Sequence, residues 1–413
     1  MRRRVLVTLV LVALTAALRL TWIGDMEFKW DERINADYIV ALHHAPFTPL
    51  APISQHAGIS HSSIFYYLVS ALSFGSEDAL VFGRAVAGFT ALCVSAALWW
   101  SRRSSALWAT FALCAVSVTL VVYCRKLWQP DLVGAWTVLA MALLGRGLDT
   151  EAPGPRALWL GAAALALSAL AHMYTAACLA AFVVATVMSI WFLATHRRAD
   201  ALTWTAALAL GAATFIPWVH AQWTNMPGAH RAHQPARAFA LGQLSSILRS
   251  DAFAPTPHGF YCLYLAPNVS WMTQYYDDWL LRITILSCCS AIIIGALLFW
   301  GALLLTLARP RELVRDPLLA CAMTLIVLNP IALFLLRLSD YPHYWLAVAP
   351  FALYVTACAW LKVERPGPAR VGRAALIGFG ALSAVAAISF IGLVHRHGGL
   401  AGEYGPAYHT LVR

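Results

Sequence analysis

Two acidic sites in the sequence have residue types and positions suited to proton transfer. Asp31 and Glu32 follow the first apolar segment, in the stretch 24–38, and Asp131 comes 100 residues later, directly after Pro130. Each site lies at the predicted start of a helix, where the positive end of the helix dipole keeps a carboxylate ionised. Such a group suits a general base that removes a proton from a hydroxyl, and it equally suits a plain N-cap. From these residues alone, both interpretations stay open.

A second group of candidates consists of cations close to the ends of apolar segments. Arginine binds phosphate oxygens through paired donors, and Arg or Lys stabilises the negative charge of a departing phosphate. The alternative is that each side chain extends along the membrane boundary to reach water. As a group these cations indicate a binding place for an anionic headgroup such as a lipid phosphate. They are Arg84, Arg125, Lys126, Arg282 and Arg337.

The composition indicates that these residues belong to a membrane protein. Hydrophobic residues make up 61% of the 413-residue chain and charged residues only 12%, about half of the ~25% that is usual in soluble domains. So few charges cannot cover a water-soluble surface, so a bundle of spanning helices is expected. Soluble enzymes, disordered chains and DNA-binding proteins are excluded as first interpretations.

Eleven segments are apolar and long enough to be spanning helices, which need about 20 residues each. The sequence therefore predicts an all-α polytopic membrane protein with about eleven transmembrane helices, which form one domain over residues 1–393. The segments are 5–23, 79–100, 106–123, 131–147, 156–172, 174–194, 201–219, 279–307, 318–338, 343–361 and 373–393.

The distribution of charge predicts the orientation of this domain. With the N-terminus inside, the inner connectors contain 16 of the 29 Lys and Arg residues and six of the 19 acids. Basic residues favour cytoplasmic loops, so a multi-pass protein of the cytoplasmic (inner) membrane is expected, with Asp31, Glu32 and Asp131 on the outer face. The net charge of +10 is then an orientation signal, and no nucleic-acid partner is expected.

The first outer stretch, 24–78, is predicted to contain two short helices that lie in the membrane interface. In the first of them Ile34, Tyr38 and Leu42 repeat at helical spacing, so this apolar side is expected to face the membrane. The two predicted helices are 32–44 and 62–74.

The second outer stretch, 220–278, is too long for a simple connector, and long loops are often functional. It is expected to cover the acidic site. Asp277 and Asp278 at its end suit a divalent cation, but paired acids at a helix start are more often caps, so no metal ligand is assigned. A short outer tail, 394–413, follows the last predicted span.

Several short motifs occur in a fixed order along the chain. They are Trp30-Asp31-Glu32 and the segments 61–67, 82–88, 123–131, 172–175 and 341–350. Their order, and the side of the membrane on which each falls, resemble the GT-C glycosyltransferases over residues 1–360. The nearest branch is that of the protein O-mannosyltransferases and lipid A aminoarabinose transferases (family 39 type). Ser62 and Ser63 stand where that branch has prolines.

This resemblance implies the transfer of a sugar from a polyprenyl-phosphate donor to a lipid, glycan or protein acceptor, with inversion of the anomeric centre. Asp31 would be the general base, with Glu32 and Asp131 as further catalytic residues that orient the acceptor. The boundary cations and Tyr344 would bind the donor phosphate. The implied substrate-binding residues are His61, Tyr67, His172, Tyr341 and His343.

Three other functions remain open on the sequence. A polysaccharide polymerase or ligase also has many spans, but it does not require an Asp-Glu pair after the first of them. A lipid or sugar transporter (a flippase) predicts buried midplane charge, whereas no acid lies in the middle of a predicted span. A non-catalytic assembly protein would tolerate Asp31→Asn. No soluble domain is predicted after the last span, so the oligosaccharyltransferase branch is not expected.

Overall fold

The computed structural model of the chain describes residues 2–44, 62–151, 154–225, 265, 273–335, 342–401 and 404–411. These residues are almost entirely helical, with one small antiparallel sheet, so the predicted all-α fold is confirmed. The α-helices are α1 (Arg2–Leu20), α2 (Trp30–His44), α3 (Ile64–Leu72), α4 (Ala79–Trp100), α5 (Ser105–Val116), α6 (Val118–Tyr123), α7 (Val133–Leu148), α8 (Arg156–Met173), α9 (Thr175–Ala194), α10 (Arg198–Ala213), α11 (Ile216–Asn225), α15 (Trp279–Leu307), α16 (Pro310–Arg315), α17 (Pro317–Leu335), α18 (Ala349–Leu361), α19 (Pro366–His397) and α20 (Tyr408–Leu411). The 3₁₀-helices and strands are η1 (Ile23–Asp25), η2 (Gln129–Leu132), η5 (Thr273–Tyr275), η6 (Pro342–Trp345), β1 (Gly399–Leu400) and β2 (Gly405–Pro406).

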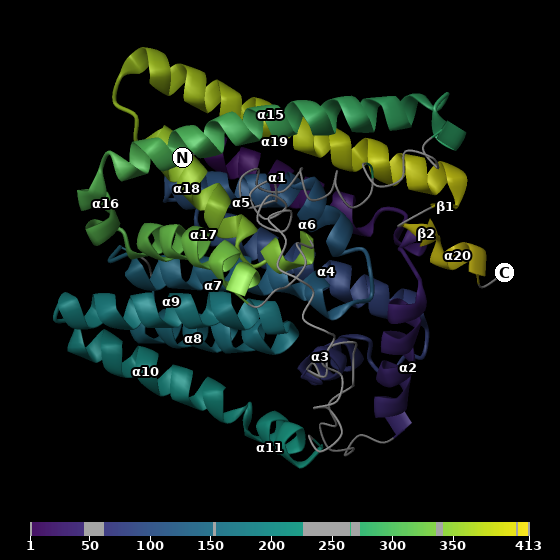
Figure 1. Ribbon diagram of the computed structural model, residues 1–413, viewed down its shortest axis with the longest axis horizontal. Coiled ribbons are helices and arrows are strands. Elements are labelled where there is room, and N and C mark those ends of the chain that lie inside the picture. The colour runs from purple at the N-terminus through teal and green to yellow at the C-terminus, as the bar shows by residue number, and fades with distance from the viewer. Residues whose placement is uncertain are drawn as a thin grey trace.

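The long helices run roughly side by side, and α2 crosses their ends (Figure 1). α15 packs along α19 on one side of the bundle, while α8 packs against α7, α9 and α10 on the other. The N-terminus of the chain lies toward the same end as α16, whereas α2 and α20 lie at the opposite end (Figure 1). We call these the α16 end and the α2 end.

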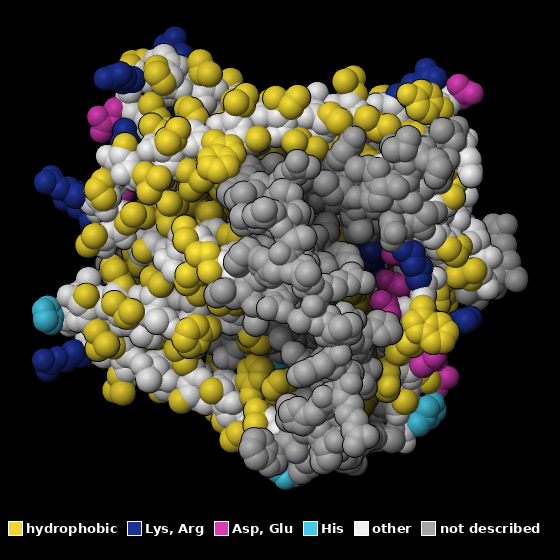
Figure 2. Space-filling view, in the orientation of Figure 1, with side chains coloured by type: hydrophobic (Ala, Val, Ile, Leu, Met, Phe, Trp, Pro, Cys, Tyr) yellow, Lys and Arg dark blue, Asp and Glu magenta, His cyan; other side chains and the backbone are white. Residues whose placement is uncertain are grey.

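Among the described residues, seven helices are long and apolar enough to cross a membrane. Figure 2 shows apolar side chains along the bundle and charged side chains gathered toward its two ends. The seven are Ala79–Trp100, Gln129–Leu148, Arg156–Met173, Ala177–Ala194, Arg198–His220, Trp279–Leu307 and Pro366–His397, and three shorter apolar helices are Ser105–Val116, Pro317–Leu333 and Ala349–Leu361. The remaining predicted span, 5–23, is helical as α1. The chain is therefore an integral membrane protein.

The predicted span at 106–123 is interrupted. α5 ends at Val116, and α6 starts after Ser117, whose ψ of 118° is not helical. The Ser117 Oγ accepts the N–H of Leu120 at 3.4 Å, which replaces one helical hydrogen bond. A serine side chain can offer the backbone this alternative to a continuous helix. Apolar length alone does not reveal the break.

α2 packs against the rest of the protein through a partly polar face. Its buried residues are Glu32, Asn35, Ala36 and Ile39. Tyr38, on the apolar face that is predicted to meet the membrane, is 39% exposed. The Asn35 amide donates to the Leu127 carbonyl oxygen and accepts from the Tyr66 hydroxyl, each at 2.8 Å. Both polar ends of this buried amide have a hydrogen-bond partner, so its burial costs little. The two bonds also fix how α2 is rotated about its axis, and therefore where Asp31 and Glu32 in its first turn point.

The segment after α19 folds back onto the loop that follows α1. β1 and β2 form a hairpin, after which Ala407 pairs with Glu27 in an isolated antiparallel bridge. The Tyr408 N–H donates to the Met26 carbonyl oxygen at 3.1 Å. Within its described residues, the predicted tail at 394–413 is therefore a packed part of the fold that covers 24–27.

Asp25→Asn is expected to loosen this covering segment. The buried Asp25 carboxylate contacts Nδ1 of His395 and Nδ1 of His409, each at 2.8 Å. Loss of hydrogen bonds to a charged group destabilises by about 1.5–3 kcal/mol, so limited proteolysis should cut the hairpin and α20 faster in the variant. Asp37→Asn, a change at an exposed acid on α2, is the control. Equal cleavage rates in the two variants would contradict this role of Asp25.

Candidate active site

Asp131 lies in η2, at the start of the helix that continues as α7. Its Oδ2 accepts the Trp128 N–H at 2.8 Å, so this oxygen caps the first turn. The side chain is buried, and its Oδ1 has no hydrogen-bond partner among the described residues. The fold therefore uses one carboxylate oxygen as a helix cap and leaves the other without a partner among the described residues.

Glu32 lies in the first turn of α2 and points into the protein. Its side chain is buried, and Oε2 accepts the Lys29 N–H at 2.9 Å. Burial, and after it the neighbouring Glu27 carboxylate, raise the pKa of Glu32 to about 7, although the Lys126 ammonium opposes the shift. A carboxyl with this pKa gains and loses a proton near neutral pH, as a general acid or base must.

Glu27 is a buried acid that sequence reasoning did not select. Its Oε2 lies 2.5 Å from Lys126 Nζ, and its Oε1 lies 2.7 Å from Lys29 Nζ. The bridge to Ala407 holds its backbone in place. One indication of its role was present in the sequence, where Glu27 is an acidic residue two positions before Lys29, in the loop after the first predicted span.

Lys126 brings three acids into one site. Burial lowers the pKa of its ammonium, but Glu27, Glu32 and Asp131 together raise it more, so the pKa lies above its ordinary value. Such effects require short separations in a medium of low dielectric. We call Glu27, Glu32, Asp131 and Lys126 the acidic cluster. With Lys29 at its edge, two ammonium groups face three carboxyls, which favours retention of a proton by one carboxyl.

Asp31 stands beside the acidic cluster but faces outward. Its side chain is exposed, and within the described part of the chain no group hydrogen-bonds to it. Its charge nevertheless reaches the Tyr66 hydroxyl, whose pKa is raised by burial, then by Tyr38 and also by Asp31. Asp31 is thus an exposed carboxylate directly before the buried Glu32.

Aromatic side chains from three segments meet next to Asp131. The rings of Trp128, Tyr174 and His343 have centroids 4.9 to 6.5 Å apart, and Tyr344 stacks on Tyr174 at 5.8 Å. These four residues form the aromatic cluster, which borders the acidic cluster because Asp131 accepts the Trp128 N–H. Rings with an apolar face and a polar edge suit the faces and hydroxyls of a sugar.

Arg125, one of the predicted phosphate ligands, is occupied by the fold. Its buried guanidinium donates to the carbonyl oxygens of Arg19, Thr21 and Trp22, at 3.2, 2.7 and 2.9 Å. Carbonyls at a helix C-terminus lack helical partners, and a cation there is stabilised by the helix dipole. Arg125 therefore clamps the end of α1, and binding a phosphate would require these bonds to break.

Two other cations of this group, Arg84 and Arg282, lie at the surface. Arg84 is exposed on α4, directly after Gly83, whose missing side chain leaves room for Met26 Sδ. This close approach places the start of α4 beside the loop that follows α1. Arg282 is also exposed, and it pairs with Asp277 at 3.4 Å. Of the predicted phosphate-binding cations that are described, Lys126 belongs to the acidic cluster.

His172 is held by hydrogen bonds on both ring nitrogens. Nδ1 lies 2.8 Å from Ser62 Oγ and Nε2 lies 2.7 Å from Thr214 Oγ1, while the ring stacks on Phe215. His172 therefore links α8 to the start of α3 and the turn between α10 and α11. Tyr67, on α3, is half-buried. The predicted site residues that lie outside the described residues are His61, Arg337 and Tyr341, with most of 220–278.

Asp278 acts as an N-terminal cap of α15. Its Oδ1 accepts the Leu280 N–H at 2.8 Å, and Arg396 Nη1 lies 3.1 Å from both carboxylate oxygens. In the ranges that the structure describes, no group of three His, Cys, Asp or Glu side chains is placed to hold a metal ion. Asp278 thus joins the start of α15 to the end of α19.

Stability is expected to decrease with rising pH through Glu32. The pKa of Glu32 is about 7 in the folded protein and 4.5 ordinarily, so between these values the folded state keeps a proton that the unfolded state releases. The free energy of unfolding should then fall by up to about 1.4 kcal/mol per pH unit from this group. Glu32→Gln should remove that contribution. Unfolding of both proteins followed across this pH range tests this, and parallel pH profiles would contradict it.

The chain has no match among protein-family models and none in sequence among curated proteins. Its fold is similar to that of ArnT from Cupriavidus metallidurans. For ArnT in the apo state the TM-score is 0.55 at 12% identity, and the match covers 95% of this chain and 76% of ArnT. For ArnT bound to undecaprenyl phosphate the TM-score is 0.54 at 13% identity, and the match covers 94% of this chain and 76% of ArnT.

The fold is also similar to that of the Archaeoglobus fulgidus oligosaccharyltransferase in complex with Zn and sulfate. The TM-score is 0.52 at 12% identity over 92% of this chain, which spans about half of that protein (53%). ArnT and the oligosaccharyltransferase are both members of the GT-C superfamily. At such low identities the likeness concerns the fold alone. It extends to an oligosaccharyltransferase, although the sequence did not favour that branch. The chain therefore shares the polytopic all-α fold of these two membrane proteins.

Proposed function

We propose that this protein is a membrane glycosyltransferase that moves a sugar from a polyprenyl-phosphate donor to an acceptor. The observation that carries the proposal is the convergence of Glu32, Asp131 and Lys126 in one buried cluster beside the accessible Asp31. This cluster lies on a fold shared with ArnT, whose crystal structure contains undecaprenyl phosphate. A lipid-phosphate donor of the same class is therefore the first substrate to test.

In the proposed reaction, Asp31 removes the proton of an acceptor hydroxyl as its oxygen attacks the anomeric carbon. The bond from that carbon to the phosphate oxygen breaks on the opposite side, so the anomeric centre inverts. The electron pair leaves with the lipid phosphate, which needs cations rather than a proton. Lys126, Arg84 and the Tyr344 hydroxyl are the groups proposed to supply this stabilisation.

Glu32 and Asp131 are proposed to orient the acceptor. The unbonded Oδ1 of Asp131 can accept a hydrogen bond from a substrate hydroxyl, and Glu32 can donate or accept according to its protonation. His343 and Tyr344 belong to the adjoining aromatic cluster, where a sugar ring can pack. The site would face the outer side of the cytoplasmic membrane, because the basic connectors favour a cytoplasmic α16 end.

Arg84→Gln is expected to raise the donor KM with little change in kcat. One lost charge-assisted hydrogen bond weakens phosphate binding by about 1.5–3 kcal/mol, which corresponds to roughly 10- to 100-fold in KM. Arg102→Gln, at the α16 end, is the matched control and should leave KM unchanged. Unchanged donor affinity in Arg84→Gln would remove Arg84 from the phosphate site.

Proteoliposomes that contain the purified protein and a radiolabelled undecaprenyl-phosphate sugar test the proposed function. The expected result is a labelled acceptor and free undecaprenyl phosphate, with the anomeric configuration inverted in the product as measured by NMR. Retention of configuration would reject single displacement. Movement of intact donor across the bilayer without cleavage would favour a flippase, and no transfer with pentose and hexose donors to lipid, glycan or peptide acceptors would reject the glycosyltransferase assignment.

A further inference from the structure

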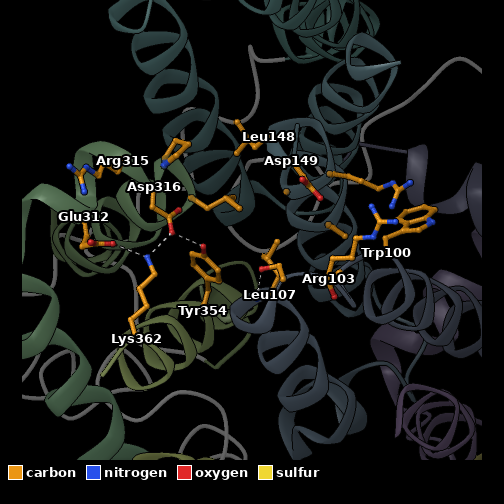
Figure 3. A pocket seen from close by; sticks show the side chains of 17 residues that line it. Trp100, Arg103, Leu107, Leu148, Asp149, Glu312, Arg315, Asp316, Tyr354 and Lys362 are labelled. Atoms are coloured by element: carbon orange, nitrogen blue, oxygen red, sulfur yellow. Dashed lines mark hydrogen bonds and ion pairs between the residues drawn. The ribbon is translucent and has the colours of Figure 1, made fainter. Parts of the chain in front are cut away.

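A cavity of about 380 Å³ lies at the α16 end of the bundle, and the acids on one of its walls have partners within the protein. Glu312 pairs with Lys362 at 2.9 Å, and Asp316 accepts the Tyr354 hydroxyl at 2.9 Å. Figure 3 shows these four side chains together on one side of the cavity. Because these contacts already satisfy the acids of that wall, they do not point to a ligand.

A second cavity, of about 10 Å³, lies between α1, α4, α6 and α7, next to the acidic cluster. A buried water molecule needs roughly 10–15 Å³, so this cavity has room for about one, whereas a sugar or a phosphate is too large for it. Most of its lining is apolar. The polar residues of the lining are Arg19, Thr90, Tyr123 and Asp131.

Arg19 is a fully buried charge that the proposed reaction does not use. It lies in α1, within a predicted span, where an ionisable residue usually pairs with another charged group. α5 ends at Val116, so the carbonyl oxygens of its last turn lack helical partners. Arg19 donates from Nη1 to the Ala115 carbonyl oxygen at 2.9 Å and from Nη2 to that of Cys114 at 3.2 Å. Its Nε–H has no hydrogen-bond partner among the described residues.

Asp131 supplies the complementary group. It lines the same cavity, and its Oδ1 has no hydrogen-bond partner within the described part of the chain. A guanidinium repels a cation and a carboxylate repels an anion, so the molecule that fits between them is neutral and both accepts and donates hydrogen bonds. Thr90 donates its own hydroxyl to the Val86 carbonyl oxygen at 3.0 Å, so its oxygen remains an acceptor toward the cavity. A water molecule meets all of these conditions.

We propose that this cavity binds one water molecule, which accepts the Nε–H of Arg19 and donates to Oδ1 of Asp131. The second hydrogen of the water is donated to Oγ1 of Thr90, and about three hydrogen bonds are typical of a buried water. Arg19 is then a positioning residue, because the bridge holds one oxygen of the Asp131 carboxyl while the Trp128 N–H holds the other.

The bridge leaves the second lone pair of Asp131 Oδ1 available to a substrate hydroxyl. Arg19 therefore acts on the acceptor only through the water and Asp131. The water site itself does not depend on sugar transfer, but the positioning role of Arg19 rests on the proposed function.

Solid-state NMR of the full chain in lipid bilayers tests the water site directly. In protein with isotope-labelled arginine, polarisation transferred from water should reach Nε of Arg19, whose signal is assigned by its loss in Arg19→Lys. Val138→Ile adds one methylene group at the cavity lining and should abolish this transfer, because the added carbon takes the space of the water. Val133→Ile is the matched control, since Val133 is also buried on α7 but does not line the cavity.

Three results would overturn the water site. They are an absence of transfer to Arg19 Nε in the wild-type protein, equal transfer in the wild-type protein and in Val138→Ile, and equal losses in the two valine variants.

Sugar transfer in proteoliposomes tests the positioning role separately. Val138→Ile should lower kcat by roughly tenfold, the effect of one lost hydrogen bond to a charged group, and it should leave the donor KM unchanged. Val133→Ile should keep both values. Each variant adds one methylene group to a packed interior, so a merely structural effect would lower the two activities together.

An unchanged kcat in Val138→Ile protein that has lost the water would overturn the role of Arg19. If the wild-type protein transfers no sugar, the proposed function fails, while the NMR result still decides the water site.

Discussion

Asp31→Asn is expected to lower kcat for sugar transfer by roughly 10²–10⁴-fold, the range for loss of a positioned general base. An amide cannot take the proton of the acceptor hydroxyl. The side chain is exposed and has no hydrogen bond within the described residues, so the substitution breaks no contact that holds the fold. The thermal unfolding midpoint and the donor KM should therefore stay close to the wild-type values.

Initial rates in proteoliposomes, measured with matched protein amounts, test this expectation. Asp37→Asn is the control, because Asp37 is a second exposed acid on α2 and should not contribute to the reaction. Full activity of reconstituted Asp31→Asn protein would remove the catalytic claim for Asp31. Glu32, with a pKa of about 7, would then be the next base to test by Glu32→Gln.

Lys126→Met is expected to cause the largest loss of stability among substitutions at the site, about 3–5 kcal/mol. Lys126 Nζ lies 2.5 Å from Glu27 Oε2, and both side chains are buried. Removal of the ammonium leaves that oxygen without its buried partner, and it increases the repulsion among Glu27, Glu32 and Asp131. The protein should also lose transfer activity, because the site then lacks its buried cation.

A double variant distinguishes the stability that is lost because a buried charge is unpaired from the stability that is lost because side-chain packing changes. Glu27→Gln/Lys126→Met removes both members of the closest ion pair and should recover part of the lost stability, while Glu32 and Asp131 remain without the ammonium. Lys29→Met is the matched control. Its side chain is 34% exposed, so the expected loss is below about 1 kcal/mol. SDS titration of the reconstituted proteins measures the free energy of unfolding of the Lys126→Met, double and Lys29→Met variants. Equal losses in the Lys126→Met and double variants would show that the broken ion pair is not the cause of the instability.

Local patterns in the sequence predicted the elements that position the site. Each predicted span corresponds to helix in the structure, and α2 and α3 occupy the two predicted interfacial helices. Asp131 occupies the helix start that Pro130 indicates. These features depend on neighbours in the chain, namely apolar length, proline geometry and side-chain caps, so a single sequence contains the information for them.

Contacts between distant segments were not predictable in the same way. The rotation of α2 depends on the fit of Asn35 to Tyr66 and to the Leu127 carbonyl, a polar contact that apolar spacing does not encode. Arg125 has the residue type of a phosphate ligand, but it binds carbonyls of α1 more than 100 residues away. Glu27 acquires its importance from Lys126 and Ala407, which only the docked structure brings to it.

The contact between Asp25 and His395 joins residues 370 positions apart. Translation supplies the loop after α1 long before α19, so Glu27 and its neighbours receive this cover only after α19 has been made. A nascent chain that has inserted only the helices before α19 would still expose these charged side chains. The ionic site at the α2 end is therefore closed late in synthesis, by a segment that follows nearly all of the helices.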